Sequence, residues 1–567
     1  MNRLRIKALM LTGLLTLLMA CNDLNEVTPD TETGVEIPDV ETELENPNET
    51  EADYNWDDTG ATNIILKNSI VEISGEGASS SGSEITISKA GTYNISGSLT
   101  DGQLVIDSDD SENVNIILNA ASITSKTSSA ISIISAEKVV FQLKEGTENT
   151  ITDAGTYDAN DEKNGALYSK ADLSFFGQGS LTVNANFEDG IVSKDGLIIE
   201  SGSFIVNAAD DAIRGKDYVL IHNGNFDLSA GGDGITSTND EDESLGFVDL
   251  KNGNYTIASG ADAIQAVTVL TLENGTYDLT TGGGSSKSTT NTAKALKAGV
   301  KLLVSGGTYD INSADDALHS NQYITIKDGS FEIVTADDGV HADEALLIDG
   351  GSITVSKSYE GLESASITVN DGNIWITSSD DGINAADGSS SGFGGPGGFS
   401  NSGATSVFLY INGGYLVVNA SGDGLDANGS IVMTGGTVLV HGPTESMNGS
   451  LDYDRSFQIS GGTLVAVGSS RMAQKPDNSS TQPSILANLS QTQSAGVVFD
   501  ITDSKGEEII CFQPMKKYQS IVYSGSNLKS GNSYNLSIGG TSTGANSDGL
   551  IAGGNYSGGT SFGTITL

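Results

Sequence analysis

The sequence predicts an all-β protein built on a right-handed, single-stranded parallel β-helix, a solenoid of about 22 residues per coil with a small β cap at each end. Apolar residues occur in pairs spaced by two, which is the period of a β-strand, and no helical period accompanies them. A glycine recurs with a basic step of 22 residues, interrupted by insertions, at Gly202, Gly224, Gly253, Gly275, Gly307, Gly329, Gly351, Gly372, Gly414, Gly436 and Gly462.

Each repeat predicts two clear strands and one short apolar contact. Positions +2 and +4 after the glycine are apolar, as in Phe226 and Leu228, and a second pair precedes the next glycine, as in Ile324 and Ile326. One repeat cannot bury its own apolar side, so the copies must stack, ~4.8 Å apart along the axis. A β-propeller is the rival, but its blades need ~40 residues or more. The crossover rule favours right-handed coils.

The aromatic residues at position +2 allow two interpretations. Each has an apolar partner at +4, which favours an internal ladder over an exposed platform for stacking sugars. The ladder would contain Phe204, Phe226, Tyr255, Tyr277, Tyr309 and Phe331.

Composition and period divide the chain into five parts. Residues 1–21 are predicted to be a lipoprotein signal peptide and residues 22–58 a disordered acidic tether. An N-terminal cap with irregular first coils follows at 59–178, the regular parallel β-helix at 179–467, and a C-terminal β cap at 468–567.

The N-terminal segment combines a basic start with a short apolar run that ends in Leu-Met-Ala-Cys. The run is too short for a stable membrane span, and its end resembles a bacterial lipobox. Cys21 would then carry lipid and anchor a secreted lipoprotein to the cell envelope or surface. A plain secretory signal with a chance cysteine is the alternative.

The charge excludes one class of partner. The chain has 27 basic and 74 acidic side chains, a net charge of −47. Binding nucleic acid requires clustered Lys and Arg, so a nucleic-acid partner is not expected. The balance favours cations, or anions bridged by cations.

An acidic corner is the main chemical signal, because position +9 is acidic in nearly every coil and position +8 is often acidic too. Stacked carboxylates ~4.8 Å apart repel by ~3 kcal/mol per pair at an effective dielectric of 20. Backbone N–H donors, raised pKa values or bound cations can each oppose this, and oxygen ligands favour Ca²⁺. Simple turn chemistry of Asp is the alternative. The predicted metal ligands are Asp189, Asp210, Asp211, Asp233, Asp262, Asp315, Asp316, Asp337, Asp338, Glu360, Asp380, Asp381 and Asp423, and Glu445 continues the column.

Polar residues beside the column are predicted to bind ligand: Arg214, Lys216, His319, His341 and Glu363. Zinc is disfavoured, because two histidines on neighbouring coils lack a defined third ligand. Arg214 is either a base for an elimination reaction or the ion-pair partner of Asp211. The inserted loop at 239–244 is a second calcium candidate, although it lacks the glycine of an EF-hand loop.

Two stretches carry a family resemblance. NGALYSKADLSFFGQGSLTVNANFEDGIVSKDGLIIESG, from Asn164, and DDAIRGKDYVLIHNG, from Asp210, resemble the calcium-binding carbohydrate-binding-domain family of bacterial surface proteins. The resemblance implies a right-handed parallel β-helix similar to pectate lyases. It also implies binding of acidic or plant cell-wall polysaccharides without known cleavage.

Three functional classes follow. The first is a non-catalytic, calcium-dependent polysaccharide binder, in which Ca²⁺ bridges protein and sugar carboxylates. The second is a calcium-dependent polysaccharide lyase with Arg214 or Lys216 as base. The third is a structural adhesin whose solenoid uses calcium only for rigidity.

Overall fold

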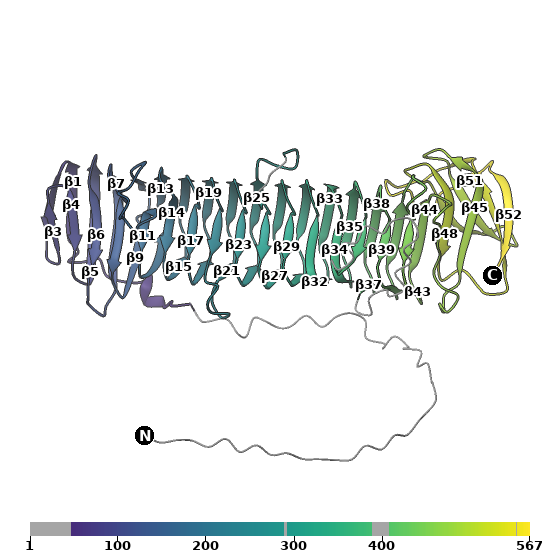
Figure 1. The fold of residues 1–567 in the computed structure, drawn as a ribbon, viewed down its shortest axis with the longest axis horizontal. Helices are drawn as coiled ribbons and strands as arrows, with labels where there is room; N and C mark the ends of the chain where they lie inside the picture. Colours follow the sequence, from purple (N-terminus) through teal and green to yellow (C-terminus); the bar gives the residue numbers. More distant parts are fainter. Residues whose placement is uncertain (1–46, 288–291, 388–406, 552) are drawn as a thin grey trace, which may run out of the picture. The chain divides into compact units, whose positions relative to one another are not determined.

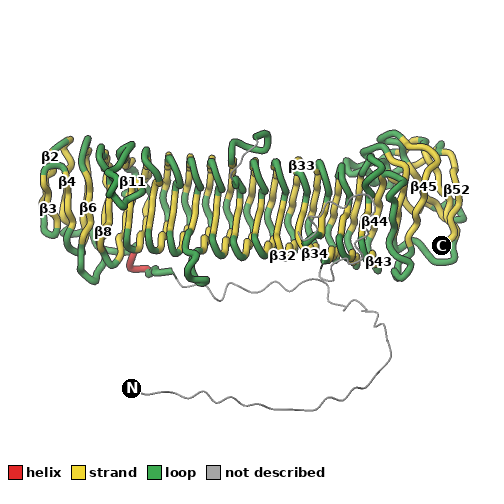
Figure 2. The backbone as a smooth tube through the Cα atoms, in the orientation of Figure 1, coloured by secondary structure: helices red, strands yellow, loops and turns green. Residues whose placement is uncertain are grey.

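The structure is a computed structural model that describes residues 47–287, 292–387, 407–551 and 553–567. Strands dominate these residues and form three stacks, here called A, B and C (Figures 1 and 2). Within a stack, a strand pairs in parallel with the strand three elements further along the chain, as β16 pairs with β19. One coil therefore contributes one strand to each stack.

Stack A contains β9 (Lys138–Leu143), β12 (Asp172–Gly177), β15 (Gly196–Ile199), β18 (Tyr218–Ile221), β21 (Phe247–Leu250), β24 (Val269–Leu272), β27 (Lys301–Val304), β30 (Tyr323–Ile326), β37 (Phe408–Ile411), β40 (Ser430–Met433) and β43 (Ser456–Ile459). Stack B contains β10 (Glu148–Thr152), β13 (Ser180–Ala185), β16 (Ser203–Ala208), β19 (Asn225–Ala230), β22 (Asn254–Ser259), β25 (Thr276–Thr281), β28 (Thr308–Ser313), β31 (Ser330–Thr335), β33 (Ser352–Ser358), β35 (Asn373–Ser378), β38 (Tyr415–Asn419), β41 (Thr437–His441) and β44 (Thr463–Gly468). Stack C contains β4 (Glu84–Ile87), β6 (Gln103–Asp107), β8 (Ile131–Ser135), β11 (Gly165–Ser169), β14 (Asp189–Ser193), β17 (Ile213–Gly215), β20 (Ile235–Ser237), β23 (Ile264–Ala266), β26 (Leu296–Ala298), β29 (Leu318–Ser320), β36 (Ile383–Ala385), β39 (Leu425–Ala427) and β42 (Leu451–Tyr453).

Four long strands belong to two stacks each. β5 (Gly91–Leu99) and β7 (Val114–Thr124) run from stack A into stack B. β32 (Val340–Ile348) and β34 (Leu362–Val369) run from stack C into stack A, with irregular register between their two halves.

The apolar side chains of the three stacks meet in one continuous core. Equivalent positions stack in register, as Tyr255 over Tyr277, whose rings lie 4.8 Å apart and within 2° of parallel. The whole aromatic series from Phe204 to Phe331 is 1–3% exposed. These residues form the predicted internal ladder, so they offer no platform for stacking sugars.

The recurrent glycine turns the chain from stack A into stack B. Gly224 has a φ of 154°, and a Cβ on it would lie 2.8 Å from the Phe226 ring. A side chain would therefore need both a disfavoured backbone conformation and displacement of the aromatic ladder.

The N-terminal end of the stacks is closed by β1 (Thr62–Asn68), β2 (Ile70–Ser74) and β3 (Ala78–Ser81). β1 pairs in parallel with β5, while the β1–β2 and β3–β4 pairs are antiparallel.

The predicted tether at 22–58 extends too far. Residues 47–58, including the short 3₁₀-helix η2 (Glu51–Asp53), pack against stack A. Asp53 forms a buried ion pair with Lys138 at 2.8 Å, and the Tyr54 and Trp56 rings contact Phe176. Low hydrophobicity suggested disorder, but the contacts of Asp53 with Lys138 and of Glu49 with His222, together with two aromatic rings, hold the segment in place.

The C-terminal end changes to antiparallel pairing. β48 (Tyr518–Ser524) pairs with β44 and with β45 (Ser484–Gln493). A separate sheet contains β46 (Phe499–Asp503), β47 (Glu508–Phe512), β49 (Ser533–Ile538) and β52 (Thr560–Thr566), and β50 (Thr541–Ser542) pairs with β51 (Tyr556–Ser557).

The all-β class and the long stacks of parallel strands are confirmed. The predicted signal peptide and Cys21 lie outside the described residues, as does the glycine-rich stretch 388–406. Within the described part, no helix has the length and apolar character needed to cross a membrane.

Candidate functional site

The acidic column lies in the turn from stack B to stack C, immediately before the stack C strands. The local sequence explains the placement: residues 209–212, which end in Asp211 and Ala212, separate β16 from β17, and Ala212 is buried. The +9 side chains are buried or half-buried, whereas Asp210 and Asp337, at +8, are exposed at the edge.

A backbone hydrogen bond connects the +9 residue of one coil to that of the next. The N–H of the later residue donates to the carboxylate of the earlier one. The described bonds are Asp211 to Asp189 (3.1 Å), Asp233 to Asp211 (2.8 Å), Asp262 to Asp233 (2.9 Å), Lys294 to Asp262 (2.8 Å), Asp338 to Asp316 (3.1 Å), Glu360 to Asp338 (2.9 Å), Asp423 to Asp381 (2.5 Å) and Gly449 to Asp423. Each acid thus satisfies an amide that the turn leaves without a strand partner. We call this series the carboxylate ladder; it leaves one oxygen of each acid available.

The +12 residues form a second row on stack C, in register from coil to coil. In order they are Arg214, Thr236, Gln265, Lys297, His319, His341, Glu363, Asn384, Asp426 and Asp452. The two basic residues, Arg214 and Lys297, lie in the first half of this row, and the two histidines follow them. The acidic residues lie in the second half, with Asn384 among them.

Basic side chains pair with several acids in the first half of the ladder. Arg214 pairs with Asp189 and, at 3.6 Å, with Asp211. Lys297 Nζ lies 2.8 Å from Asp262 Oδ2. Because Arg214 is bound by two carboxylates, the structure favours its interpretation as an ion-pair partner.

Lys294 occupies the ladder position between Asp262 and Asp316. Its Nζ lies 2.9 Å from Asp315 Oδ1 and 2.6 Å from Asp316 Oδ2. Burial raises the pKa of Asp316, but hydrogen bonds from histidine and the charge of Lys294 hold that pKa well below its usual range. Lys294, which interrupts the acidic pattern, therefore neutralises the carboxylates beside it.

The second half has no such partners. We call Glu360, Glu363, Asp381, Asp423, Asp426 and Asp452 the acidic segment. Within the described part of the chain, no Lys or Arg lies within ion-pair distance of its members. Burial, together with neighbouring carboxylates, raises the pKa of Glu360 to about 8, of Asp381 to about 7, of Asp423 to about 6 and of Asp426 to about 8. The fold therefore concentrates carboxylates here at an electrostatic cost that hydrogen bonds offset in part and that no Lys or Arg of the described residues neutralises.

Asn384 adds a neutral oxygen to the acidic segment. Its Nδ2 donates to Glu360 Oε2 at 2.9 Å, and the side chain stands between Glu363 and Asp426 on stack C. The residue is only 9% exposed, yet its buried Oδ1 has no hydrogen-bond partner. A buried amide oxygen without a donor fits a cation-binding site, because calcium takes amide as well as carboxylate oxygens.

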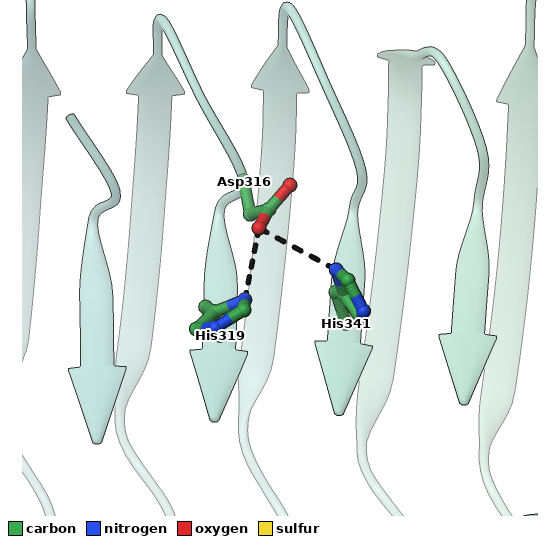
Figure 3. Close-up of side chains that lie close together, drawn as sticks. All are labelled: Asp316, His319 and His341. Carbon is green, nitrogen blue, oxygen red and sulfur yellow. Dashed lines mark hydrogen bonds and ion pairs between the residues drawn. The ribbon is translucent and has the colours of Figure 1, made fainter. Parts of the chain in front are cut away.

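The two histidines lie where the first half of the ladder meets the acidic segment. His319 Nδ1 is 3.0 Å from Asp316 Oδ2, and its Nε2 is 3.1 Å from Asn321 Oδ1. His341 Nδ1 is 3.7 Å from the same Asp316 oxygen. Figure 3 shows both imidazoles on neighbouring strands with the Asp316 carboxylate between them.

Three predicted positions behave differently from expectation. Lys216 lies past the end of β17 and pairs with Glu241 of the inserted loop at 3.6 Å, away from the ladder. The loop itself is organised by Asn239 Oδ1, which accepts the N–H groups of Glu241 and Asp242. Glu445 is largely exposed and pairs with Lys517, because a four-residue insertion moves the ladder position to Gly449.

Sequence reasoning missed Asp452 for the same reason. It pairs in register with Asp426, but the insertion places it four residues after the expected +12 position. Moving the count by the length of the insertion would have found it. Asp210, Asp315, Asp337 and Asp380 do lie beside the ladder: Asp210 is grouped with Asp189 and Asp211, and Asp337 with Asp315 and Asp316.

Comparison with known proteins gives a family match over part of the chain. Residues 81–339 match the model of a family described as carbohydrate-binding domain-containing protein. A curated protein of the same description from Acetivibrio thermocellus is 39% identical over 137 residues, which is 24% of this chain and 48% of that protein. The chain thus spans about half the length of the curated relative.

Among solved structures, a gadolinium derivative of a polysaccharide lyase-like protein from C. thermocellum is 34% identical. The match covers 44% of this chain and 93% of that one, with a TM-score of 0.36. The resemblance predicted from Asn164 onward is supported in its broad form: residues 81–339 match that family model, and the curated relative carries the same description.

Proposed function

We propose that this protein binds polysaccharide without cleaving it, through calcium ions held by the acidic segment. The single observation that carries the proposal is that Glu360, Asp381, Asp423 and Asp426 are gathered on successive coils without a basic partner. The family match over residues 81–339 supports carbohydrate as the ligand class.

The donor chemistry supports calcium in particular. The acidic segment offers carboxylate oxygens and the unpartnered Oδ1 of Asn384, and no thiolate or imidazole lies on its stack C row beyond His341. Calcium takes 6–8 oxygen ligands at 2.3–2.6 Å, which carboxylates from adjacent coils, backbone carbonyls and water can supply. The ion would neutralise the mutual repulsion that raises these pKa values.

An acidic glycan suits this arrangement better than a neutral one. Carboxylates alone repel a uronate chain, whereas a bound Ca²⁺ with open coordination positions can join a protein carboxylate to a sugar carboxylate. Pectin-like or other cell-wall polysaccharides are therefore the proposed partners. We further propose that the stacks form a right-handed parallel β-helix, and that Cys21 carries the lipid that holds this secreted protein at the bacterial envelope or cell surface.

Paired variants test the proposal. Asp381→Asn with Asp426→Asn removes two charges from the acidic segment and keeps the side-chain shapes. Asp227→Asn, on the exposed face of β19, is the matched control. We expect the double variant to lose calcium-dependent binding of acidic polysaccharide and the control to keep it. Equal binding by both would contradict the assignment, and appearance of unsaturated sugar products would identify a lyase instead.

A further inference from the structure

His341 lies within ion-pair distance of four carboxylates, one of which is that of Asp343, with Oδ1 3.4 Å from the imidazole Nε2. Its Nδ1 lies 3.7 Å from Asp316 Oδ2, 3.8 Å from Asp338 Oδ2 and 3.6 Å from Glu363 Oε2. These distances exceed that of a hydrogen bond. His341 Nδ1 therefore lies near three carboxylate oxygens without a direct hydrogen bond to any of them.

Asp338 is the most constrained member of this group. The residue is 6% exposed, and its Oδ1 accepts the N–H of Glu360. Its Oδ2 has no hydrogen-bond partner among the described residues, and the contact recorded for it is His341 Nδ1. Burial and neighbouring carboxylates raise the pKa of Asp338 to about 10.

Asp316 is less available than the other two carboxylates. The ammonium of Lys294 and the imidazole of His319 already bind its Oδ2, at 2.6 and 3.0 Å. Asp338, His341 and Glu363 are then the three residues with ligand atoms to spare, and those atoms lie within 4.8 Å of one another.

The spacing suits a small tetrahedral cation. Bonds of 2.0–2.1 Å to nitrogen and oxygen place two ligand atoms of a tetrahedral zinc site about 3.3 Å apart. The separations of 3.6 and 3.8 Å from His341 Nδ1 need a closure of a few tenths of an ångström, and the Asp338 and Glu363 ligand atoms lie within 4.8 Å of each other. Glu363 retains 22% of its side-chain exposure, so it has room to move and leaves a path for entry.

We propose that His341, Asp338 and Glu363 bind a divalent transition-metal cation, with Zn²⁺ as the representative ion. Sequence alone disfavoured zinc because the two histidines lacked a defined third ligand. The structure supplies two carboxylates beside His341, and His319 supports Asp316 behind them. Imidazole is a ligand of zinc, copper, iron and nickel, whereas calcium prefers oxygen.

This site shares Glu363 with the acidic segment but is otherwise separate from the proposed calcium function. It uses one imidazole and lies at the coils that begin with β32 and β34, while the calcium proposal centres on Asp381, Asp423 and Asp426 in later coils. Either proposal can fail without the other.

The test is zinc binding by the purified protein, measured by competition with a chromophoric chelator in excess Ca²⁺. Cobalt serves as a spectroscopic probe, because tetrahedral Co²⁺ with a nitrogen ligand absorbs intensely in the visible range. We expect one tightly bound ion that calcium does not displace. Loss of a residue that only supports a metal ligand typically weakens metal binding by about 10–100-fold. His341→Ala and Glu363→Gln each remove a ligand, so each should weaken zinc binding by more than that.

His222→Ala is the matched control, since His222 pairs with Glu49 elsewhere on the molecule. Circular dichroism of each variant identifies any that fails to fold, and Glu363→Gln, at a partly exposed position, keeps the test open if His341→Ala does fail. Zinc affinity that is equal in the wild type and Glu363→Gln, or ready displacement of zinc by calcium, would overturn the proposal. So would the absence of zinc binding altogether.

Discussion

The backbone N–H of Asp262 donates a 2.9 Å hydrogen bond to Oδ1 of Asp233, although 29 residues separate them. The same bond joins Asp233 to Asp211 across 22 residues. The seven extra residues form a loop outside the coil, and the chain after the loop rejoins the stack in register. One oxygen of each carboxylate thus accepts a structural hydrogen bond, and only the other oxygen can bind a ligand.

Removing one rung of the carboxylate ladder should destabilise the protein locally. Asp233→Ala leaves the N–H of Asp262 without its acceptor, which should cost about 1–3 kcal/mol. Asp233→Asn retains an oxygen acceptor and should cost less. Urea unfolding of the two variants measures the difference; equal losses would show that the carboxylate charge, and not the acceptor, matters.

The acidic segment should make stability depend on pH in the absence of calcium. Its pKa values of about 6 to 8 in the folded state lie above those of an unfolded chain, near 4. The folded protein then binds more protons in this interval, so the free energy of unfolding falls as pH rises from about 4 to 8.

Calcium should reverse that loss, because it binds the ionised carboxylates. At a free concentration of about 100 times Kd, it adds about 2.7 kcal/mol. Thermal melts in EDTA and in Ca²⁺ at pH 5 and pH 8 test this. We expect calcium to raise Tm more at pH 8; a larger rise at pH 5 would contradict the assignment.

Lys294 should be essential for stability, because it interrupts the carboxylate ladder and pairs with two neighbouring acids. Lys294→Met leaves Asp315 and Asp316 without their ammonium partner in a buried position, which should cost about 3–5 kcal/mol. Lys67→Met is the control, since the Lys67–Glu72 pair is half-exposed and worth at most about 1 kcal/mol. Similar losses for the two variants in urea unfolding would refute the role given to Lys294.

The aromatic ladder should contribute to stability and not to glycan binding. Tyr277→Ala removes a ring stacked at 4.8 and 4.7 Å between two others and should cost about 3–5 kcal/mol. Tyr277→Phe loses only the hydrogen bond to the Asn274 carbonyl, about 1 kcal/mol. Chemical denaturation separates the two effects. Lower glycan affinity in Tyr277→Phe, with stability retained, would argue for an exposed sugar platform.

Local periodicity was sufficient to predict the interior and the strands of stacks A and B, whereas the short strands of stack C were predicted only as an apolar contact. The pairs at +2 and +4, such as Phe226 and Leu228, depend only on alternation along one strand. Contacts between coils were not accessible in this way. The hydrogen bond from the Asp262 N–H to Asp233 spans an insertion. The Lys294–Asp316 pair and the carboxylates around His341 lie one repeat apart, but their distances depend on side-chain positions that periodicity does not give. The packing of Asp53 on Lys138 joins segments 85 residues apart and carries no periodic signal.

The most direct test of the central claim is binding of the wild-type protein to acidic and neutral polysaccharides, measured in Ca²⁺ and in EDTA. The proposed function predicts retention on acidic polysaccharide in calcium, release by EDTA and no unsaturated products. Binding that persists unchanged in EDTA would contradict calcium bridging. A calcium-dependent rise in Tm without binding to any glycan would mean that the acidic segment only stabilises the solenoid.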